Sequence, residues 1–447
     1  MSLTAAIFVL LFTAGCLMAL ARHPVYGVMT YVIMFYVSPS DRWWGQGVTQ
    51  GTRWALIAAV VTALAILIHR PKSPNIPLVR QPLMWGYIAF VAWVAIQSGW
   101  AVYPDLHREL LTYYLKYIVA MYLIYRSIDS EVNLKRVIWA HVLGCAYISW
   151  VAFSLASGER FDNFGGAGIG DANSGALTIV TGILAAASLF VASSTKARLV
   201  LVGIMPFLVN AIVATISRSG FLAFVTAGLA YNYFAPRKYA KWIKILSLVG
   251  LVLFLALTNP VYWARIQSLK YEGQHVEGVD TGAKRLVLMQ AQLQMAHKYP
   301  YGCGSRCTDY LSPQYLDSKQ LAGAPGEQSR SSHNTFMTML VDHGIPGAIA
   351  YVLMVGWILS ALRRLRRDCA SRDDVLAQIL PAVAGGLLAI TVGDMFVQYP
   401  KLEVRFWLLT IVMSMLSMAT DRQGAAASAF DDVARPPASD LERQPPA

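Results

Sequence analysis

The chain has unusually few charged residues. Only 14% of its 447 residues are Asp, Glu, Lys or Arg, whereas 56% are hydrophobic. A soluble domain carries about 25% charged residues, so the composition excludes an ordinary soluble fold. The hydrophobic residues form long runs, and a membrane-spanning helix needs roughly 20 of them. These runs are continuous and do not alternate with polar residues as the strands of a membrane β-barrel do. The sequence therefore predicts an all-α, polytopic membrane protein.

Acidic residues are fewer than basic ones. The chain has 25 Asp and Glu against 37 Lys and Arg, which gives a formal net charge of +12. The basic residues are scattered among many connections, a pattern typical of a multi-pass protein with basic cytoplasmic loops. We therefore expect membrane lipids as partners and no nucleic acid.

Cysteines and paired carboxylates are also scarce. Of five cysteines, Cys303 and Cys307 lie in one long polar segment, where they could form a local disulfide if that segment faces an oxidising compartment. Two further ligands at a spacing suited to zinc are not evident. No carboxylate pair with Asp-x-Asp spacing lies in the connections that we assign to the outside, so we expect neither a metal nor another cofactor.

Thirteen apolar segments are candidate membrane spans. They cover residues 3–21, 25–38, 54–69, 83–100, 110–126, 137–157, 174–194, 199–216, 220–235, 245–258, 346–362, 377–397 and 406–420. The second segment is short and could form a hairpin with the first that does not fully cross, so we expect about twelve transmembrane helices. No Lys or Arg precedes the first segment, which we interpret as a membrane helix and not as a secretory signal.

Lys and Arg in the short connections orient these helices. Basic connections such as 363–367 alternate with connections that carry at most two such residues. These poor connections are 39–53, 101–109, 158–173 and 217–219. Because cytoplasmic loops carry the excess of Lys and Arg, the poor connections lie outside. By alternation the long polar segment 259–332 lies outside too, in the periplasm of a Gram-negative cell.

This reading divides the chain into four parts. Residues 1–258 form the N-terminal transmembrane helices, and residues 259–332 form a large periplasmic loop with short helices. Residues 333–420 form the C-terminal transmembrane helices. Residues 421–447, rich in Ala and Pro, are expected to be a disordered cytoplasmic tail.

Three arginines in the external connections are candidates for binding a phosphorylated substrate. Arg160 follows the sixth span, Arg218 occupies the turn between the eighth and ninth spans, and Arg285 lies in the long loop. Arginine binds phosphate through two parallel hydrogen bonds and keeps its proton. The alternative is an interfacial anchor whose side chain reaches the lipid headgroups. We favour that alternative for a single arginine in general, and phosphate binding for Arg218, which is confined to a short turn without an acidic neighbour.

Polar residues inside the predicted spans are further candidates. Lys116 lies near the external end of the fifth span, where a cation faces either the bundle interior or the headgroups. We expect His141 to hydrogen-bond to a neighbouring helix. Asp394 could balance a cation, but the sequence does not indicate which one.

Residues 285–297 are predicted to form an amphipathic helix that could cover the site. Leu286, Met289, Leu293 and Ala296 share one face of such a helix.

His333 is the candidate general base, at the exit of the long loop. Ser331 or Ser332 can cap the following helix, which places His333 in its first turn. The positive end of the helix dipole and nearby arginines disfavour a charged imidazole. A neutral imidazole can accept a proton from a hydroxyl group. The plainer alternative is a polar residue at a helix start.

Three motifs around the long loop resemble those of the O-antigen ligase and polymerase superfamily of bacterial membrane glycosyltransferases. They are residues 217–223 (SRSGFLA), Arg285 with residues 295–304 (MAHKYPYGCG), and residues 333–337 (HNTFM) with 344–347 (GIPG). Their order and spacing give the resemblance over residues 205–365. Residues 171–175 (DANSG) show a looser likeness to a family motif at the start of a span.

The resemblance implies a GT-C-like enzyme of the bacterial inner membrane with its active site facing the periplasm. Such an enzyme transfers a glycan from undecaprenyl diphosphate to a hydroxyl group, with inversion and without metal. The resemblance also implies His333 as the general base and Arg218, Arg285, Arg160 and Lys116 as ligands of the diphosphate.

The acceptor distinguishes the members of this superfamily. In an O-antigen ligase it is a sugar of the lipid A-core oligosaccharide, and in a polymerase it is another lipid-linked repeat unit. The R-x10-G pattern of polymerases has no clean instance here, which favours a ligase. A polymerase of surface polysaccharide and a protein O-glycan ligase are the alternatives, and a flippase of lipid-linked sugars is the alternative from another class.

Overall fold

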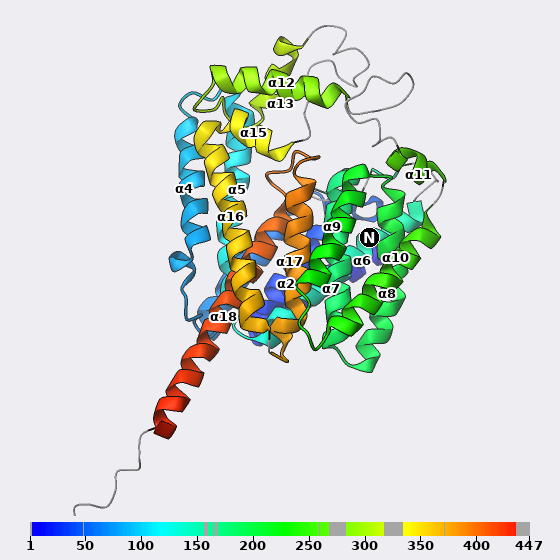
Figure 1. Cartoon of the computed structure of the whole chain (residues 1–447), viewed down its shortest axis with the longest axis vertical. Helices are drawn as coiled ribbons and strands as arrows, with labels where there is room; N and C mark the ends of the chain where they lie inside the picture. Colours follow the sequence, from blue (N-terminus) through cyan, green and yellow to red (C-terminus); the bar gives the residue numbers. More distant parts are fainter. Residues whose placement is uncertain are drawn as a thin grey trace, which may run out of the picture.

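The computed structural model describes residues 2–47, 49–155, 160–162, 164–165, 169–258, 260–267, 283–316, 334–370 and 372–434, without the side chains of 265, 283–286 and 421–434. Every regular element in these residues is helical (Figure 1), which confirms the all-α class. The α-helices are α1 (Leu3–Ala21), α2 (Val25–Val37), α3 (Trp54–His69), α4 (Pro82–Gln97), α5 (Pro104–Ser127), α6 (Glu131–Leu155), α7 (Ala172–Ala192), α8 (Thr195–Ala214), α9 (Arg218–Tyr233), α10 (Ala240–Leu257), α11 (Pro260–Gln267), α12 (Ala283–Lys298), α13 (Cys307–Leu311), α15 (Thr335–Asp342), α16 (Gly344–Cys369), α17 (Val375–Gly393) and α18 (Glu403–Ala434). Short 3-10 helices are η1 (Pro39–Asp41), η2 (Trp43–Gly45), η3 (Leu78–Arg80) and η5 (Ser312–Tyr315).

Eight helices of the described residues are long and apolar enough to cross a membrane. They are α1, α6, α7, α8, α10, α16, α17 and the part Glu403–Thr420 of α18. The helices α3 and α4 are apolar but shorter. The chain is thus a multi-pass membrane protein, and the expected number of about twelve crossings stays a prediction.

The centre of the bundle is built on α7, α17 and the part Glu403–Thr420 of α18. Within their most apolar windows, 83%, 72% and 89% of the residues are buried. Small residues allow these helices to approach their neighbours closely, as is common between membrane helices. A Cβ added at Gly182 of α7 would lie 2.6 Å from the sulfur of Cys145, and one at Gly385 of α17 would lie 2.6 Å from a methyl carbon of Leu184. Bulkier residues at these glycines would force the helices apart.

The predicted external connections meet at one end of the bundle. There α12, α13 and α15 lie together, whereas α18 projects past the opposite end (Figure 1). The N–H of Val102 donates to the carbonyl of Cys303 at 2.9 Å, and the N–H of Phe161 donates to the carbonyl of Ala214 at 2.9 Å. We call this end of the molecule the outer end.

The polar residue His141 behaves as predicted. Its ring nitrogens contact the hydroxyl of Tyr36 on α2 at 2.7 Å and the hydroxyl of Thr181 on α7 at 2.9 Å. The expected hydrogen bonding to neighbouring helices is confirmed, and His141 joins α6 to both.

Two sequence-based expectations about helices differ from the structure. The last helix, α18, continues to Ala434, although we expected disorder from Asp421 onward. Residues 424–429 are mostly alanine, the strongest helix former, and no proline lies between Asp421 and Pro436. Helix α12 exists where expected, but its buried face carries Leu288, Ala291 and Met295, while Leu293 is 55% exposed. Packing of Met295 against Cys303 and Cys307 sets this face.

Candidate functional site

The turn between α8 and α9 holds its serines in fixed positions. Ser217 caps α9, because its side chain accepts a hydrogen bond from the N–H of Gly220 at 3.0 Å. Both hydroxyls, of Ser217 and of Ser219, donate to Oδ1 of Asn173, at 2.7 and 3.2 Å. Arg218 lies between these serines as the first residue of α9, and it is 7% exposed. A buried cation at a helix N-terminus is placed where anions bind.

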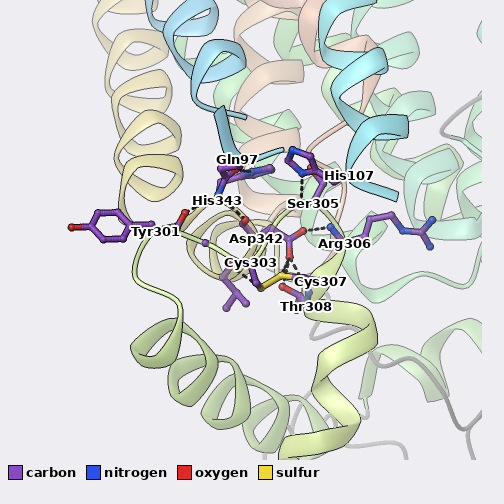
Figure 2. Close-up of a disulfide and its surroundings, with 12 residues drawn as sticks. Gln97, His107, Tyr301, Cys303, Ser305, Arg306, Cys307, Thr308, Asp342 and His343 are labelled. Carbon is purple, nitrogen blue, oxygen red and sulfur yellow. Dashed lines mark hydrogen bonds between the residues drawn. A yellow bond between two sulfur atoms is a disulfide. The ribbon is translucent and has the colours of Figure 1, made fainter. Parts of the chain in front are cut away.

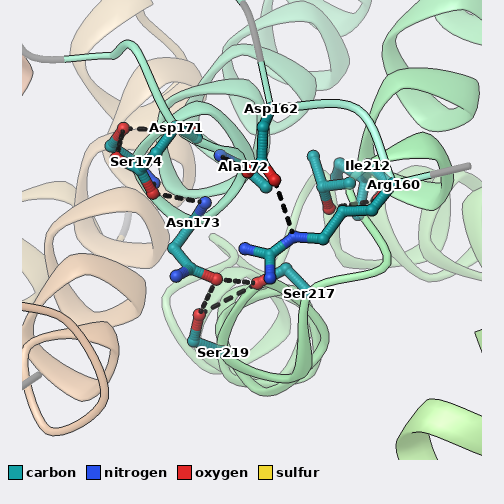
Figure 3. A network of polar contacts seen from close by, with 10 residues as sticks. Arg160, Asp162, Asp171, Ala172, Asn173, Ser174, Ile212, Ser217 and Ser219 are labelled. Carbon is teal, nitrogen blue, oxygen red and sulfur yellow. Dashed lines mark hydrogen bonds and ion pairs between the residues drawn. The ribbon is translucent and has the colours of Figure 1, made fainter. Parts of the chain in front are cut away.

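Arg160 lies beside this turn (Figure 3). Its Nε forms an ion pair with Asp162 at 3.4 Å. Asp162 in turn accepts from the N–H of Ala172 at 2.8 Å, so it connects Arg160 to the start of α7. Asp171 caps α7 through the N–H groups of Asn173 and Ser174. The structure thus brings residues 160–162, 171–174 and 217–220 together, although they are separated in sequence.

The second and third sequence motifs meet in what we call the outer clamp, which comprises Gln97, His107, residues 301–306, Asp342 and His343 (Figure 2). Glycines permit the close approach. Gly302, Gly304 and Gly344 have φ angles of +81°, +96° and +69°, which favour glycine. A Cβ on Gly302 would lie 2.5 Å from the carbonyl oxygen of Asp342 and 2.6 Å from the nitrogen of Gly344. The G-x-G motif is therefore required by backbone contact.

Within the outer clamp, Gln97 and two neutral histidines join the backbone of residues 301–305 and the end of α15 to α4 and α5. The amide of Gln97 donates to the carbonyl of Tyr301 at 2.8 Å, and its oxygen faces Nδ1 of His343 at 2.8 Å. Nδ1 of His343 must then carry the proton. His107 accepts from the N–H of Ser305 at 2.9 Å through Nδ1, so its proton lies on Nε2, which donates to the carbonyl of Val94.

Burial lowers the pKa of both histidines. The pKa of His343 falls to about 3, through burial and, secondarily, the charge of His107 when it is protonated. The pKa of His107 is also lowered by burial. Both rings therefore act as neutral structural links at pH 7.

Asp342 organises the residues that follow the G-x-G motif. Its carboxylate accepts from the N–H groups of Arg306 at 2.6 Å and Thr308 at 2.9 Å, and from the Thr308 hydroxyl at 2.6 Å. Burial raises the pKa of Asp342 to about 7, although the bonds from Thr308 oppose this shift. Cys303 and Cys307 form a disulfide beside it. Their sulfur atoms lie near the carboxylate, but the disulfide leaves no thiolate for a metal.

The beginning of α15 is fixed by a second buried network. Thr335 donates its hydroxyl to Oδ1 of Asp394 at 3.1 Å and to the carbonyl of Val397 at 2.7 Å. Its N–H donates to the carbonyl of Asp394 at 2.7 Å. Asp394 also accepts from Tyr351 at 2.7 Å and pairs with Arg405, and both members of this ion pair are about 3% exposed. Arg405 is the cation that the sequence did not identify.

The family comparison agrees with this geometry. Residues 203–352 match the family model described as O-antigen ligase. This segment belongs to the O-antigen ligase superfamily. The matched range contains the turn at Arg218, helix α12, the G-x-G motif and α15. No curated protein matches the chain in a sequence search.

The cap of α15 differs from our expectation. Asn334 is the N-cap, because its side chain accepts from the N–H of Met337 at 3.0 Å. The prediction that Ser331 or Ser332 caps this helix is therefore wrong. Asn caps helices as well as Ser does, and Asn334 directly precedes the first helical residue. His333 thus comes before the cap instead of within the first turn, and it lies outside the described residues.

The structure does not bring all the other predicted site residues together. Arg160 and Arg218 share the cluster around Asn173. Arg285 begins α12, with its side chain outside the described part. Lys116 is exposed on α5, with Nζ 5.1 Å from the ring centre of Tyr113.

Sequence reasoning missed Gln97, His107, His343 and Arg405. His343 follows the H-N motif of residues 333–337, and His107 precedes the predicted span 110–126. Nothing in their local sequence shows that both lie against the G-x-G segment. Arg405 begins an apolar segment only two residues after Glu403. Arg405 lies eleven residues after Asp394, but the two are not on one helix, because the chain turns between α17 and α18. Helical spacing therefore could not predict their ion pair.

Proposed function

We propose that the protein is an O-antigen ligase. It would transfer a glycan from undecaprenyl diphosphate to a hydroxyl group of the lipid A-core oligosaccharide, at the periplasmic face of the bacterial inner membrane. The observation that carries the proposal is the position of Arg218. It is buried at the N-terminus of α9, in a turn fixed by Asn173, within the segment that matches the O-antigen ligase family.

The proposed reaction needs one base and a site for the leaving group. The acceptor oxygen forms a bond to the anomeric carbon, and the bond from that carbon to the diphosphate oxygen breaks with inversion. His333 takes the acceptor proton, and undecaprenyl diphosphate leaves as an anion. Arg218 and Arg285 hold that anion, with Arg160 and Lys116 as weaker contributors. A base of this kind contributes about 10²–10⁴-fold to the rate.

The anchoring of α15 supports the role of His333. The outer clamp fixes the end of α15, and Thr335 fixes its beginning through Asp394 and Val397. The backbone is therefore fixed at Thr335, two residues after His333. Such support is what a general base requires, because small displacements are costly.

Transfer of a glycan by the purified protein tests the arginine roles. Arg218→Ala and Arg285→Ala should each lower transfer by about 100-fold, since they remove charge that stabilises the leaving diphosphate. Arg→Lys should also be impaired, because an ammonium group cannot form the two parallel hydrogen bonds. Arg198→Ala is the matched control, since Arg198 contacts the carbonyl of Phe190 at the opposite end of α8. Full activity of Arg285→Ala would refute the assignment.

Substitution of His333 separates transfer from transport. His333→Ala should bind the lipid-linked donor but not transfer its glycan, because a base acts only on the bond-forming step. We expect chelation by EDTA to leave the wild-type rate unchanged. Near-normal transfer by both His333→Asn and His333→Gln would remove His333 from the mechanism. Movement of the donor across a bilayer without transfer would instead favour a flippase.

A further inference from the structure

An apolar groove lies between α2, α3 and α5. Its volume is about 840 Å³. Leu56 on α3 and Val119 on α5 line it and are 53% and 52% exposed, so the groove opens sideways to the membrane. On α5 the lining runs from Thr112 to Ile124. At 1.5 Å per residue this is about 18 Å, more than half of the hydrocarbon thickness of about 30 Å.

The outer end of this groove carries positive charge. Arg53 and Lys116 line it, and both are exposed, whereas the acidic lining residue Glu403 is buried and accepts a hydrogen bond from the hydroxyl of Tyr31. Nζ of Lys401 lies 5.4 Å from the ring centre of Tyr113, the ring that Lys116 also covers. Among the described residues, none forms an ion pair with these three cations. Burial and the charge of Arg306 lower the pKa of Lys401, and the charges of Glu109 and Asp309 only partly oppose this shift. An apolar groove below such cations fits an amphiphile with a negatively charged head.

The groove mouth adjoins both halves of the candidate site. Ser38 and Pro39 line the mouth, and the nearby Arg42 donates to the carbonyl of Phe164 at 2.7 Å, beside the segment that carries Arg160. On the other side, the hydroxyl of Tyr117 donates to the carbonyl of Lys401 at 2.8 Å. That carbonyl belongs to the turn whose Val397 holds Thr335.

We propose that this groove binds the polyprenyl chain of the lipid-linked donor, with Lys116 and Lys401 at its mouth adding to the positive charge that faces the diphosphate. The assignment rests on the proposed function, which supplies the class of lipid. A lipid A acceptor carries several acyl chains side by side, whereas a groove between three helices suits one chain. The headgroup would then lie between the segment at Arg160 and the turn before Arg405.

Filling the groove tests this assignment without requiring transfer. Ala59 lines the groove, whereas its neighbour Val60 does not and is 49% exposed. Ala59→Trp should weaken binding of undecaprenyl diphosphate by about 10-fold, and Val60→Trp should leave it unchanged, as measured by native mass spectrometry. Because this readout needs no acceptor, its failure is distinguishable from failure of the ligase assignment.

Donor chain length provides the second arm. With a glycan on a ten-carbon prenyl diphosphate, Ala59→Trp and wild type should transfer equally well, which also shows that the variant is folded. With the undecaprenyl donor, the variant should require about 10-fold more substrate. Equal binding of undecaprenyl diphosphate by Ala59→Trp and wild type would overturn the proposal. Loss of a bound phospholipid by the variant, with undecaprenyl diphosphate binding unchanged, would overturn it as well.

Discussion

Gly302 shows how strongly a single residue of the outer clamp is constrained. Its φ is +81° and its missing Cβ would meet backbone atoms of Asp342 and Gly344, which cannot move aside. Gly302→Ala should therefore destabilise the protein by about 3 kcal/mol, from left-handed strain and overpacking together. Gly356→Ala is the control, because nothing lies within 4 Å of that Cβ, and it should be neutral or stabilising by up to about 1 kcal/mol. Thermal unfolding in detergent measures both; equal melting temperatures would contradict the close-approach argument.

Thr335 is the residue through which the Asp394–Arg405 pair reaches α15. Thr335→Val keeps the shape but removes a hydroxyl with three partners, Asp394, Val397 and the N–H of Tyr399. Leaving these buried groups unpaired costs about 1–3 kcal/mol, and transfer should fall because the start of α15 loosens. The matched control is Thr338→Val, since within the described part of the chain the Thr338 hydroxyl contacts only the carbonyl of Asn334 in the preceding turn. Similar kcat values for the two variants would show that the anchor does not position the site.

At the scale of elements, α15 is a short helix held at both ends. It has eight residues and could not remain helical alone in water. Its N-cap Asn334 and the network of Asp394 fix one end, and the outer clamp fixes the other. The helix is therefore as stable as these two attachments, and conditions that break either should affect transfer.

Acid should weaken the attachment of α15 to α4 and α5. The folded-state pKa of His343 is depressed to about 3 by burial, against about 6.5 for an exposed histidine. Its contribution to stability is thus present above pH 6.5 and is lost as pH falls toward 3, by about 1.4 kcal/mol per pH unit. His107 acts in the same direction. Asp342 has a raised pKa of about 7, so its contribution has the opposite sign and weakens as pH rises through 7.

A difference measurement isolates His343. In His343→Asn, the amide nitrogen can replace Nδ1 as donor to Gln97 but does not titrate. Melting temperatures between pH 7 and pH 4 should fall more steeply for wild type than for this variant, while Asp342 contributes equally to both. Parallel curves would contradict a neutral buried His343. Since the outer clamp itself titrates, loss of transfer at low pH implicates His333 only where the melting temperature is unchanged.

The sequence predicted elements better than their attachments. Apolar runs and three motifs indicated nearly every helix and the family, because burial in lipid imposes long runs and close backbone contact imposes glycines. The buried face of α12 and the cap of α15 could not be predicted, since each depends on partners such as Met295 with the disulfide. The contact of Asn173 with Ser217 was not predicted either, because residues 171–175 showed only a loose likeness to a family motif and nothing in the sequence places them beside the turn.

At the scale of the molecule, the contacts of the N-terminus bear on the number of crossings. The hydroxyl of Ser2 donates to the carbonyl of Trp44 at 3.2 Å, and residues 39–53 belong to the predicted external connections. The N-terminus therefore lies at the outer end, while α18 leaves the bundle at the other end (Figure 1). Termini at opposite ends require an odd number of passages. The number of crossings, about twelve, stays a prediction, and thirteen is the odd number that the candidate segments allow.

The outer end is predicted to face the periplasm, and accessibility of single cysteines tests this. Tyr301 is 66% exposed at the outer end, and its side chain points away from the other residues of the outer clamp (Figure 2). Lys196 is exposed in the first turn of α8, at the opposite end. The free cysteines Cys16, Cys145 and Cys369 are first replaced, whereas the disulfide of Cys303 and Cys307 is retained because it does not react with maleimides.

In intact spheroplasts, Tyr301→Cys should react with a membrane-impermeant maleimide, and Lys196→Cys should react only after lysis. The physical reason is the excess of Lys and Arg in the connections at the end of the bundle where Lys196 lies. Connections that are rich in Lys and Arg stay in the cytoplasm. The reverse labelling pattern would invert the topology. The arginine turn, the outer clamp and the groove mouth would then face the cytoplasm, and a ligase acting on lipid A-core at the periplasmic surface would be excluded.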